Sequence, residues 1–343
     1  MKKRLLIWCF MAISYSVFAQ DWPNISTESR PGSRWWWLGS AVDKENLTYN
    51  LEEYAKAGLG AMEITPIYGV QGNDKNNIPY LTPQWMDILQ HTQAEGKRLG
   101  IQIDMNMGTG WPFGGPHISI ADAATKAIFQ TYEAEGGQKV IIDIQVQDPK
   151  QAPHATLSRI MAYSDKGTCL NLTSKAKNGQ LEWQAPQGKW DIGVLYIGKT
   201  LQKVKRAAPG GEGYVMDHLN KQAVARYFAH FEKAFKENKT HYPHTFFNDS
   251  YEVYGADWAP DLLEQFAKRR GYKLEEHFLE FLSKERNETV ARIVSDYRET
   301  ISDLLLENFT RPWSAFARKH GSTTRNQAHG SPANLIDTYA AVD

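Results

Sequence analysis

The sequence contains almost no cysteine, and this scarcity limits how the fold can be stabilised. Only two cysteines, Cys9 and Cys169, occur in 343 residues. Cys9 lies in an apolar N-terminal segment, so the remainder of the chain has no second thiol with which to form an intrachain disulfide. An exported protein of this size without disulfides must be stabilised by a large apolar core, and it is typical of a bacterial periplasm.

Net charge and long hydrophobic runs are also lacking. The 39 basic and 39 acidic residues give a formal net charge of zero, so no basic field exists to attract nucleic acid. No stretch approaches the roughly 20 apolar residues that a membrane span requires. The sequence therefore predicts neither a nucleic-acid partner nor a transmembrane segment.

The N-terminal residues have the pattern of a targeting signal. Three basic residues, Lys2, Lys3 and Arg4, precede an apolar run over 5–14, and small residues near Ala19 suit a cleavage site. This order of charged, apolar and small residues is that of a secretory signal peptide. We therefore interpret residues 1–20 as a signal peptide and expect secretion, into the periplasm of a bacterium.

Short apolar strands alternate with helical segments along most of the remaining chain. Helical spacing of apolar residues follows Asp43 and again follows Thr82-Pro83, and Gly58 and Gly100 are suited to ending these helices. Such alternation predicts parallel strands joined by crossover helices. The five strands expected from the pattern are 34–38, 61–66, 101–106, 245–250 and 323–330.

The sequence pattern changes between residues 133 and 205, where the alternation of strands and helices stops. Short strand-like runs are separated there by Gly, Pro, Asn and Asp turns. The segment is too long for a plain loop, which indicates a structure of its own. We expect a small antiparallel β module inserted between residues 21–132 and residues 206–343.

Five β/α units are too few to close a (β/α)8 TIM-type barrel, which needs eight strands. The expected fold class is therefore α/β, a partial barrel truncated before closure, with the remainder of a longer polypeptide to follow. An open doubly wound sheet is the alternative. Polar residues at the ends of all five strands, rather than at one switch point, favour the barrel.

The strand at 245–250 becomes abruptly polar and is followed by Glu252. An apolar strand that ends in carboxylates and amides is typical of the catalytic rim of such a barrel. Glu252 is accordingly the candidate catalytic acid, although a loop that merely caps a helix would look the same. Glu63 is a second unusual acid, because a carboxylate inside a buried strand needs a partner or a role.

Other polar and aromatic residues lie at strand ends or in glycine-rich loops. The loop 108–115 is not followed by Lys-Ser/Thr, so it suits close approach to a ligand better than it suits a nucleotide phosphate. Asp217 and His218 follow a second glycine-rich stretch and are either metal or sugar ligands or simple helix caps. The residues that could bind substrate are Trp36, Asp104, Asn106, Trp111, Asn248, Asp249, Arg325, Gln327 and His329, with a structural role also open for each.

An ordered set of motifs resembles the α-L-rhamnosidases of glycoside hydrolase family 106. The set covers essentially the whole chain after the signal. Its members are RWWWLG at 34–39, AGLGAME at 57–63, LTPQW at 81–85, GTGWP at 108–112, GGP at 114–116, NDSYE at 248–252, FAKRRGY at 266–272 and RNQAHG at 325–330.

The resemblance implies a (β/α)8 catalytic domain that hydrolyses rhamnose-containing plant glycans, including pectic polysaccharides, with inversion and with a bound calcium ion. It implies that Glu252 is the general acid. It also implies that the general base lies beyond Asp343, so that the 343-residue chain by itself is expected to be inactive. The calcium ligands are not assigned by the resemblance.

Inverting hydrolysis needs one carboxylic acid to protonate the leaving oxygen and one carboxylate to activate water, roughly 6.5–9.5 Å apart. Glu252 is therefore expected to have a raised pKa, through apolar walls such as Tyr251, Tyr254 or Trp258. A truncated, non-hydrolytic carbohydrate-binding protein remains the alternative. A sugar isomerase on the same fold would need a His/Glu/Asp metal quartet, which the sequence does not present at suitable spacing.

Overall fold

The structure is a computed structural model that describes residues 23–285 and 287–343. The predicted signal peptide, residues 1–20, lies outside the described residues. None of the described helices is both long enough and apolar enough to cross a bilayer.

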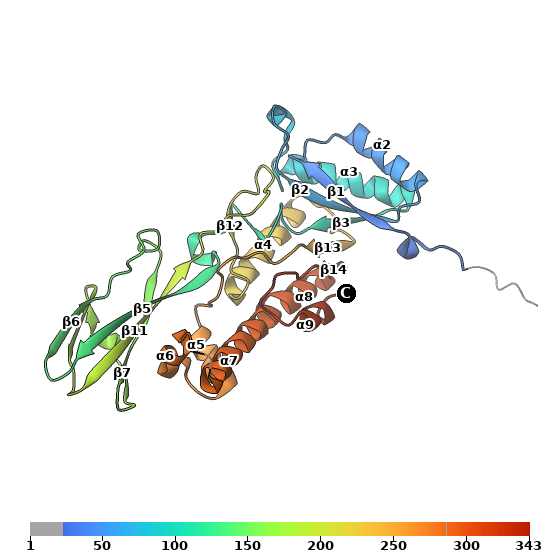
Figure 1. Ribbon diagram of the computed structural model, residues 1–343. Helices are drawn as coiled ribbons and strands as arrows, with labels where there is room; N and C mark the ends of the chain where they lie inside the picture. Colours follow the sequence, from blue (N-terminus) through green and yellow to red (C-terminus); the bar gives the residue numbers. More distant parts are fainter. Residues whose placement is uncertain (1–22, 286) are drawn as a thin grey trace, which may run out of the picture.

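A five-stranded parallel sheet organises the chain (Figure 1). The predicted parallel pairing is confirmed, and the spatial order of the strands follows their order in the sequence without reversal. A doubly wound sheet reverses its order at a switch point, so this topology is not doubly wound. The strands are β1 (Gly32–Leu38), β2 (Ala61–Ile67), β3 (Gln102–Asn106), β13 (Thr245–Asn248) and β14 (Thr323–Asn326).

Helices connect the strands, and their ends are set by capping residues that the sequence displays. The Asp43 carboxylate accepts the Asn46 N–H at the start of α2 (Lys44–Lys56), and the Thr82 hydroxyl accepts the Trp85 N–H at the start of α3 (Pro83–Leu99). Gly100 ends α3 at a φ of 70°, a left-handed conformation that glycine adopts without steric cost. The remaining helices are α4 (Lys221–Glu237), α5 (Leu262–Arg270), α6 (Phe278–Leu282), α7 (Glu288–Leu305), α8 (Arg311–Lys319) and α9 (Leu335–Ala340).

The long helical path from Glu288 to Lys319 contains one π-helical turn. This turn, Leu306–Thr310, joins α7 to α8 without a break in the helical path. Pro312 follows it in the first turn of α8 and cannot donate a backbone hydrogen bond to the preceding turn. The π-helical turn lies where the proline interrupts the regular pattern of backbone hydrogen bonds.

One face of the sheet packs against the helices. Ile64, Met105 and Phe246 point to this face and are fully buried with helix residues such as Trp85 and Phe231. Because side chains alternate along a strand, their neighbours point to the other face, which is polar. The residues on that face include Arg34, Trp36, Glu63, Asp104 and Arg325, with Phe247 among them.

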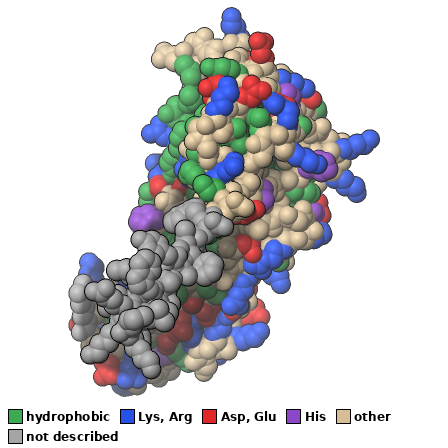
Figure 2. Space-filling model, turned by 90° about the vertical axis from the view of Figure 1, so that its right-hand side faces the viewer, with side chains coloured by type: hydrophobic (Ala, Val, Ile, Leu, Met, Phe, Trp, Pro, Cys, Tyr) green, Lys and Arg blue, Asp and Glu red, His purple; other side chains and the backbone are tan. Residues whose placement is uncertain are grey.

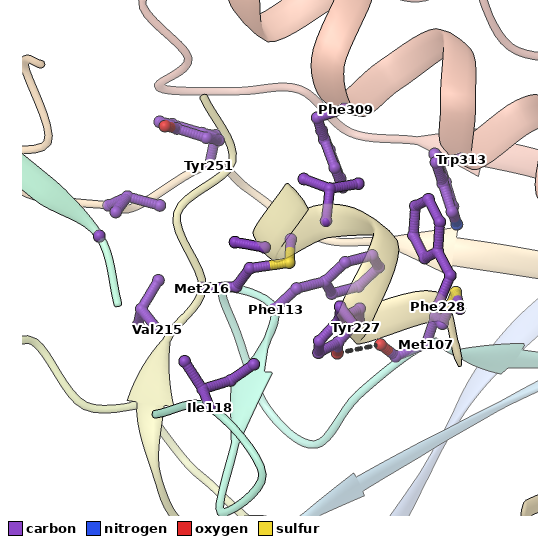
Figure 3. Packing of buried hydrophobic residues seen from close by; sticks show 14 of the residues in the cluster. Met107, Phe113, Ile118, Val215, Met216, Tyr227, Phe228, Tyr251, Phe309 and Trp313 are labelled. Carbon is purple, nitrogen blue, oxygen red and sulfur yellow. Dashed lines mark hydrogen bonds between the residues drawn. The ribbon is translucent and has the colours of Figure 1, made fainter. Parts of the chain in front are cut away.

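A second part of the core fills the space between the loop after β3, α4 and α7–α8 (Figure 3). The Phe113 ring stacks on Tyr227 with centroids 5.5 Å apart, and Phe309 and Trp313 pack edge-on against Phe113. The buried Tyr227 hydroxyl donates to the Met107 carbonyl at 2.6 Å, which satisfies its polar group. This packing anchors the glycine-rich loop after β3.

The middle of the chain forms two antiparallel sheets, which lie at the opposite end of the molecule from β1 and α2 (Figure 1). They enclose an apolar cluster of their own that includes Ile160, Trp183, Trp190 and Val194. The first strand starts at Thr125, eight residues before residue 133. The strands are β5 (Thr125–Glu135), β11 (Lys189–Lys199), β7 (Thr156–Ser164) and β8 (Cys169–Asn171) in one sheet, and β6 (Lys139–Asp143), β10 (Gln180–Gln184) and β9 (Ala176–Lys177) in the other.

Charges of both signs are interspersed on the surface that Figure 2 presents. Lys and Arg side chains lie beside Asp and Glu side chains over the coloured part of that face, in keeping with the zero net charge of the sequence. No single-sign field gathers on the part of that face that the coloured residues form.

Candidate active site

An ion-pair network covers the polar face of the parallel sheet. The pairing register places Arg34 opposite Glu63 and Glu63 opposite Asp104. Arg34 Nε lies 3.0 Å from Glu63 Oε1, and Arg34 Nη1 lies 2.9 Å from Asp249 Oδ2. Arg325 contacts Glu63 and also lies 3.2 Å from Asp104 Oδ2. Two arginines thus hold three carboxylates that come from three different strands or strand ends.

This network supplies the partners that Glu63 needs as a carboxylate inside a buried strand. Glu63 and Asp104 are only 5% and 2% exposed, and a buried carboxylate is tolerated when it is paired and hydrogen-bonded. The Thr65 hydroxyl adds a third hydrogen bond to Glu63 at 3.0 Å. The partner that the sequence requires for Glu63 is therefore a pair of arginines.

The network also determines what three of the predicted substrate-binding residues can do. Asp104, Asp249 and Arg325 are mutually engaged through it, so their charges are neutralised within the protein. Asp104 is in the middle of β3 rather than at its end, and its second oxygen lies 3.3 Å from His244 Nδ1. The Asp104 carboxylate raises the pKa of His244. Direct contact of Asp104 with a sugar would require this network to open.

Glu252 follows β13 at the C-terminal edge of the sheet and is surrounded by hydrogen-bond donors. Lys205 Nζ lies 2.5 Å from Glu252 Oε2, and the Tyr254 hydroxyl donates to the same oxygen at 2.9 Å. The Ser250 hydroxyl donates to Oε1 at 3.0 Å. Both carboxylate oxygens are therefore oriented, while the side chain stays 28% exposed and open to a ligand.

The expectation of a raised pKa for Glu252 is wrong for this structure. The Lys205 ammonium is the largest cause of a pKa lowered to about 2, with Tyr254 and Ser250 acting in the same direction. The apolar wall that the sequence suggested is not formed, because Tyr254 turns its hydroxyl toward the carboxylate and Trp258 is buried in the core. In this state Glu252 is an ionised carboxylate at all ordinary pH values.

Lys205 belongs to a segment that sequence reasoning did not single out as functional. Its backbone N–H donates to the Trp111 carbonyl at 2.8 Å, and its carbonyl accepts the Trp111 N–H at 3.1 Å. The next carbonyl, of Arg206, accepts the Tyr68 N–H at 3.1 Å. The segment 202–206, here called the basic segment, is thus bound to the loops that follow β2 and β3.

Three cations of the basic segment each lie against a tyrosine ring. Lys203 Nζ is 3.2 Å from the Tyr214 ring centroid, Lys205 Nζ is 4.3 Å from that of Tyr254, and the Arg206 guanidinium is 5.2 Å from that of Tyr68. Of the three, only Lys205 forms an ion pair within residues 23–285 and 287–343. The signal that could have identified this segment is the run Lys203-Val-Lys-Arg206, which begins four positions after the end of β11.

Four other predicted binding residues lie around the same edge of the sheet. Trp36 is 43% exposed on the polar face, with the Arg34 guanidinium 5.1 Å from its ring. Gln327 and His329 are exposed, and the His329 carbonyl accepts the Tyr251 N–H at 2.7 Å. Trp111 is half-buried in the loop after β3, where its backbone pairs with Lys205. These residues are available to a ligand at the strand ends.

Two predicted amides are structural in this arrangement. The Asn248 side chain donates to Asn326 Oδ1 at 3.0 Å across neighbouring strands. The Asn106 side chain donates to the Gly110 carbonyl at 2.8 Å, although its own Oδ1 is buried without a protein partner. Asn248 ties two strand ends together, and Asn106 shapes the turn that carries Trp111.

Asp217 and His218 are in the core rather than in the site. They are 1% and 2% exposed, and Asp217 accepts hydrogen bonds from the Thr125 hydroxyl at 2.5 Å and from the Leu219 N–H at 3.0 Å. Burial raises the pKa of Asp217 to about 6 and lowers that of His218 to about 4. The structure therefore excludes the metal or sugar-ligand interpretation for both, and Asp217 joins the start of the β module to α4.

A donor set for calcium is not assembled in the described part of the chain. Within it, no three His, Cys, Asp or Glu side chains converge so that they could hold a metal ion. Glu63 on the polar face of the sheet, and Asp249 and Glu252 after β13, are each bound by an arginine or a lysine. In this arrangement the described carboxylates do not form a calcium site by themselves.

Comparison with known proteins gives consistent matches over most of the chain. A family model described as alpha-L-rhamnosidase matches residues 23–157 and 151–341. A curated protein from Formosa agariphila named putative beta-glucuronidase is 26% identical over an alignment 387 residues long, which covers 96% of this chain and 33% of that protein. A solved rhamnosidase from Novosphingobium sp. PP1Y superimposes with a TM-score of 0.74 at 16% identity, over 94% of this chain and 48% of the other. The chain thus spans about a third to a half of the length of these proteins.

Proposed function

The chain belongs to the alpha-L-rhamnosidase family of glycoside hydrolases, whose model matches nearly all of the described residues, and we propose that it provides the general acid, Glu252, for inverting hydrolysis of α-L-rhamnosides. The observation that carries the proposal is the position of Glu252 directly after β13, at the C-terminal edge of a parallel sheet. Active-site groups of β/α barrel enzymes are found at that edge. Glu252 is also held by hydrogen-bond donors there and still remains 28% exposed.

The reaction requires two proton transfers on opposite faces of the sugar. Protonated Glu252 gives its proton to the glycosidic oxygen as the bond from that oxygen to the anomeric carbon breaks. A water molecule adds to that carbon from the other face, and a second carboxylate takes its proton. We assign this base to none of the described carboxylates, because Glu63, Asp104 and Asp249 are neutralised by arginines.

We propose that the parallel sheet forms the first five strands of a (β/α)8 barrel. The support is the sequential strand order and the division of the sheet into a helix-covered face and a polar face. Such a sheet has unpaired edges at β1 and β14 among the described strands. Five strands hold only part of a barrel site, so the 343-residue chain alone is expected to hydrolyse rhamnosides poorly.

The substrate proposed is a rhamnose-containing plant glycan of the pectic type. The support is an exposed edge that offers aromatic rings, Trp36 and Tyr68, each beside an arginine that can hydrogen-bond to sugar hydroxyls. Calcium stays a prediction of the family resemblance. No step of the proposed reaction depends on it.

The polypeptide extended to all eight strands of the proposed barrel is here called the native-length protein. Its incubation with an aryl α-L-rhamnoside and, separately, with an aryl β-D-glucuronide tests the proposed activity. We expect release of rhamnose, first as the β-anomer by proton NMR, and no cleavage of the glucuronide. Cleavage of the glucuronide alone would instead favour an activity like that in the name of the Formosa protein. Rhamnoside binding without any hydrolysis would support the alternative of a non-hydrolytic carbohydrate-binding protein.

A further inference from the structure

The Lys205–Glu252 contact has a consequence for how the proposed acid works. Lys205 Nζ and the Tyr254 hydroxyl both bind Glu252 Oε2, and the Ser250 hydroxyl binds Oε1. The hydroxyls of Tyr254 and Ser250 can reverse their hydrogen bonds, since a hydroxyl both donates and accepts. An ammonium group only donates. Lys205 is therefore the one contact that is incompatible with a proton on Oε2.

We propose that Lys205 is a positioning residue for Glu252, which holds the carboxylate ionised in the empty site and leaves Oε2 when substrate enters. The inference rests on the proposed function, because only an acid has to be protonated. It extends that function by giving the site two states, one with the Lys205 ammonium on the carboxylate and one without it.

The surroundings allow the ammonium to move while the backbone stays in place. Both the N–H and the carbonyl of Lys205 are bonded to Trp111, and the neighbouring Val204 is buried. The Lys205 side chain is 37% exposed, so a ligand can reach it. The same Nζ also lies 3.1 Å from the Tyr254 hydroxyl and 4.3 Å from the Tyr254 ring centroid, so the ammonium has other favourable contacts close by when it leaves Oε2.

Few groups face Glu252, so the groups that set the protonation state of its carboxyl can be named. Among residues 23–285 and 287–343, the titratable groups in contact with the carboxylate are Lys205 from the basic segment and Tyr254 from the same loop, with Ser250 as a neutral donor. Gln202 binds the Glu252 backbone carbonyl at 2.7 Å and adds no charge. The lowered pKa of Glu252, about 2, has Lys205 as its largest cause. Removal of this ammonium should therefore allow the carboxyl to titrate near its ordinary range.

The pH dependence of turnover separates the two states. The profile of kcat/KM reports groups of the free enzyme, and the profile of kcat reports those of the substrate complex. In the native-length protein we expect the high-pH limb of kcat to lie at least about one pH unit above that of kcat/KM, since an opposite charge typically shifts a carboxyl pKa by one to three units. Lys205→Met should bring the two limbs together, and Lys205→Arg should restore the gap.

Lys203→Met is the matched control for this experiment. Lys203 belongs to the same segment and loses the same charge, but it lies against Tyr214 and does not contact Glu252. The gap between the two limbs should persist in Lys203→Met. Coincident limbs in the unmodified protein, or a gap that survives in Lys205→Met, would overturn the proposal.

A titration that needs no turnover distinguishes failure of this inference from failure of the proposed function. The Glu252 carboxyl carbon is identified by NMR through the signal that disappears in Glu252→Gln. We expect it to titrate at about 2 in the unmodified chain and clearly higher in Lys205→Met. An ordinary pKa of Glu252 in the unmodified chain would contradict the proposal that Lys205 keeps this carboxylate ionised, whether or not rhamnosides are hydrolysed. If Glu252 titrates at about 2 but the native-length protein hydrolyses no rhamnoside, the interaction with Lys205 is supported and the proposed hydrolase activity is rejected.

Discussion

Gly110 is the residue that allows the basic segment to lie where it does. A Cβ added at Gly110 would be 1.9 Å from the Lys205 carbonyl oxygen and 2.8 Å from the Arg206 carbonyl carbon. These are backbone atoms, so they cannot turn aside as the end of a flexible side chain can. The glycine therefore determines whether Lys205 can reach Glu252.

Gly110→Ala should accordingly destabilise the protein by about 1–3 kcal/mol, through overpacking and through the positive φ of 51°. It should also raise the pKa of Glu252 by displacing Lys205. Urea unfolding measures the first effect, and carboxyl NMR measures the second.

Gly72→Ala is the control, because Gly72 also has a positive φ, 82°, but a Cβ there would meet no atom within 4 Å. It should be the milder substitution and should leave Glu252 unchanged. Equal losses of stability in the two variants would show that the contact with the basic segment contributes nothing.

For individual residues, the sequence predicts which side chains are unusual but not which distant side chains they contact. Glu63 could be recognised as needing a partner, because a lone carboxylate in a buried strand is costly. Its partners Arg34 and Arg325 lie 29 and 262 positions away in the chain, and only the strand register brings them together. Glu252 could likewise be placed at a strand end, but the sign of its pKa shift depends on Lys205, which is 47 positions away.

The elements themselves were largely predictable, because local signals specify them. The apolar runs gave four of the strands of the sheet to within two residues at each end, and the capping residues Asp43 and Thr82 gave two helix starts. The last strand, β14, ends at Asn326 rather than near Gly330. Its polar end is a turn, which sequence alternation alone does not separate from a strand.

The start of α7 depends on a cap of the same kind. Asn287 Oδ1 accepts the Val290 N–H at 2.9 Å, which satisfies one of the free donors of the first turn. Asn287→Ala should cost about 1 kcal/mol of stability. Asn287→Asp, which keeps an acceptor at that position, should cost much less in the same urea titration. If the two variants lost equal stability, the side-chain cap would not be what fixes this helix end.

The molecule as a whole combines the helix-backed parallel sheet with the antiparallel sheets of residues 125–199 (Figure 1). The sequence indicated this division through a change near residue 133 from alternating strands and helices to short strand-like runs. In the structure, β5 already pairs with β11 from Thr125 onward. Long-range antiparallel pairing of this kind has no local signature. The return of the chain through the basic segment, which carries Lys205 to the sheet edge, was missed for the same reason.

Limited proteolysis tests whether the antiparallel sheets behave as a separate module. Residues 145–154 form an irregular and largely exposed connection between β6 and β7. Exposed irregular segments are cleaved first, because a protease needs an unfolded stretch of backbone. We expect the earliest cuts there by mass spectrometry, with α2, α3 and α4 intact. First cuts within those helices would contradict a separate module.

The most direct test of Glu252 as the acid compares two leaving groups in the native-length protein. An activated aryl α-L-rhamnoside needs little protonation of its leaving oxygen, whereas a rhamnosyl disaccharide needs full protonation. Glu252→Gln should lower turnover of the disaccharide by about 100-fold or more, in line with typical general-acid contributions, and should lower turnover of the aryl rhamnoside far less. Small and equal losses on both substrates would show that Glu252 is not the proton donor.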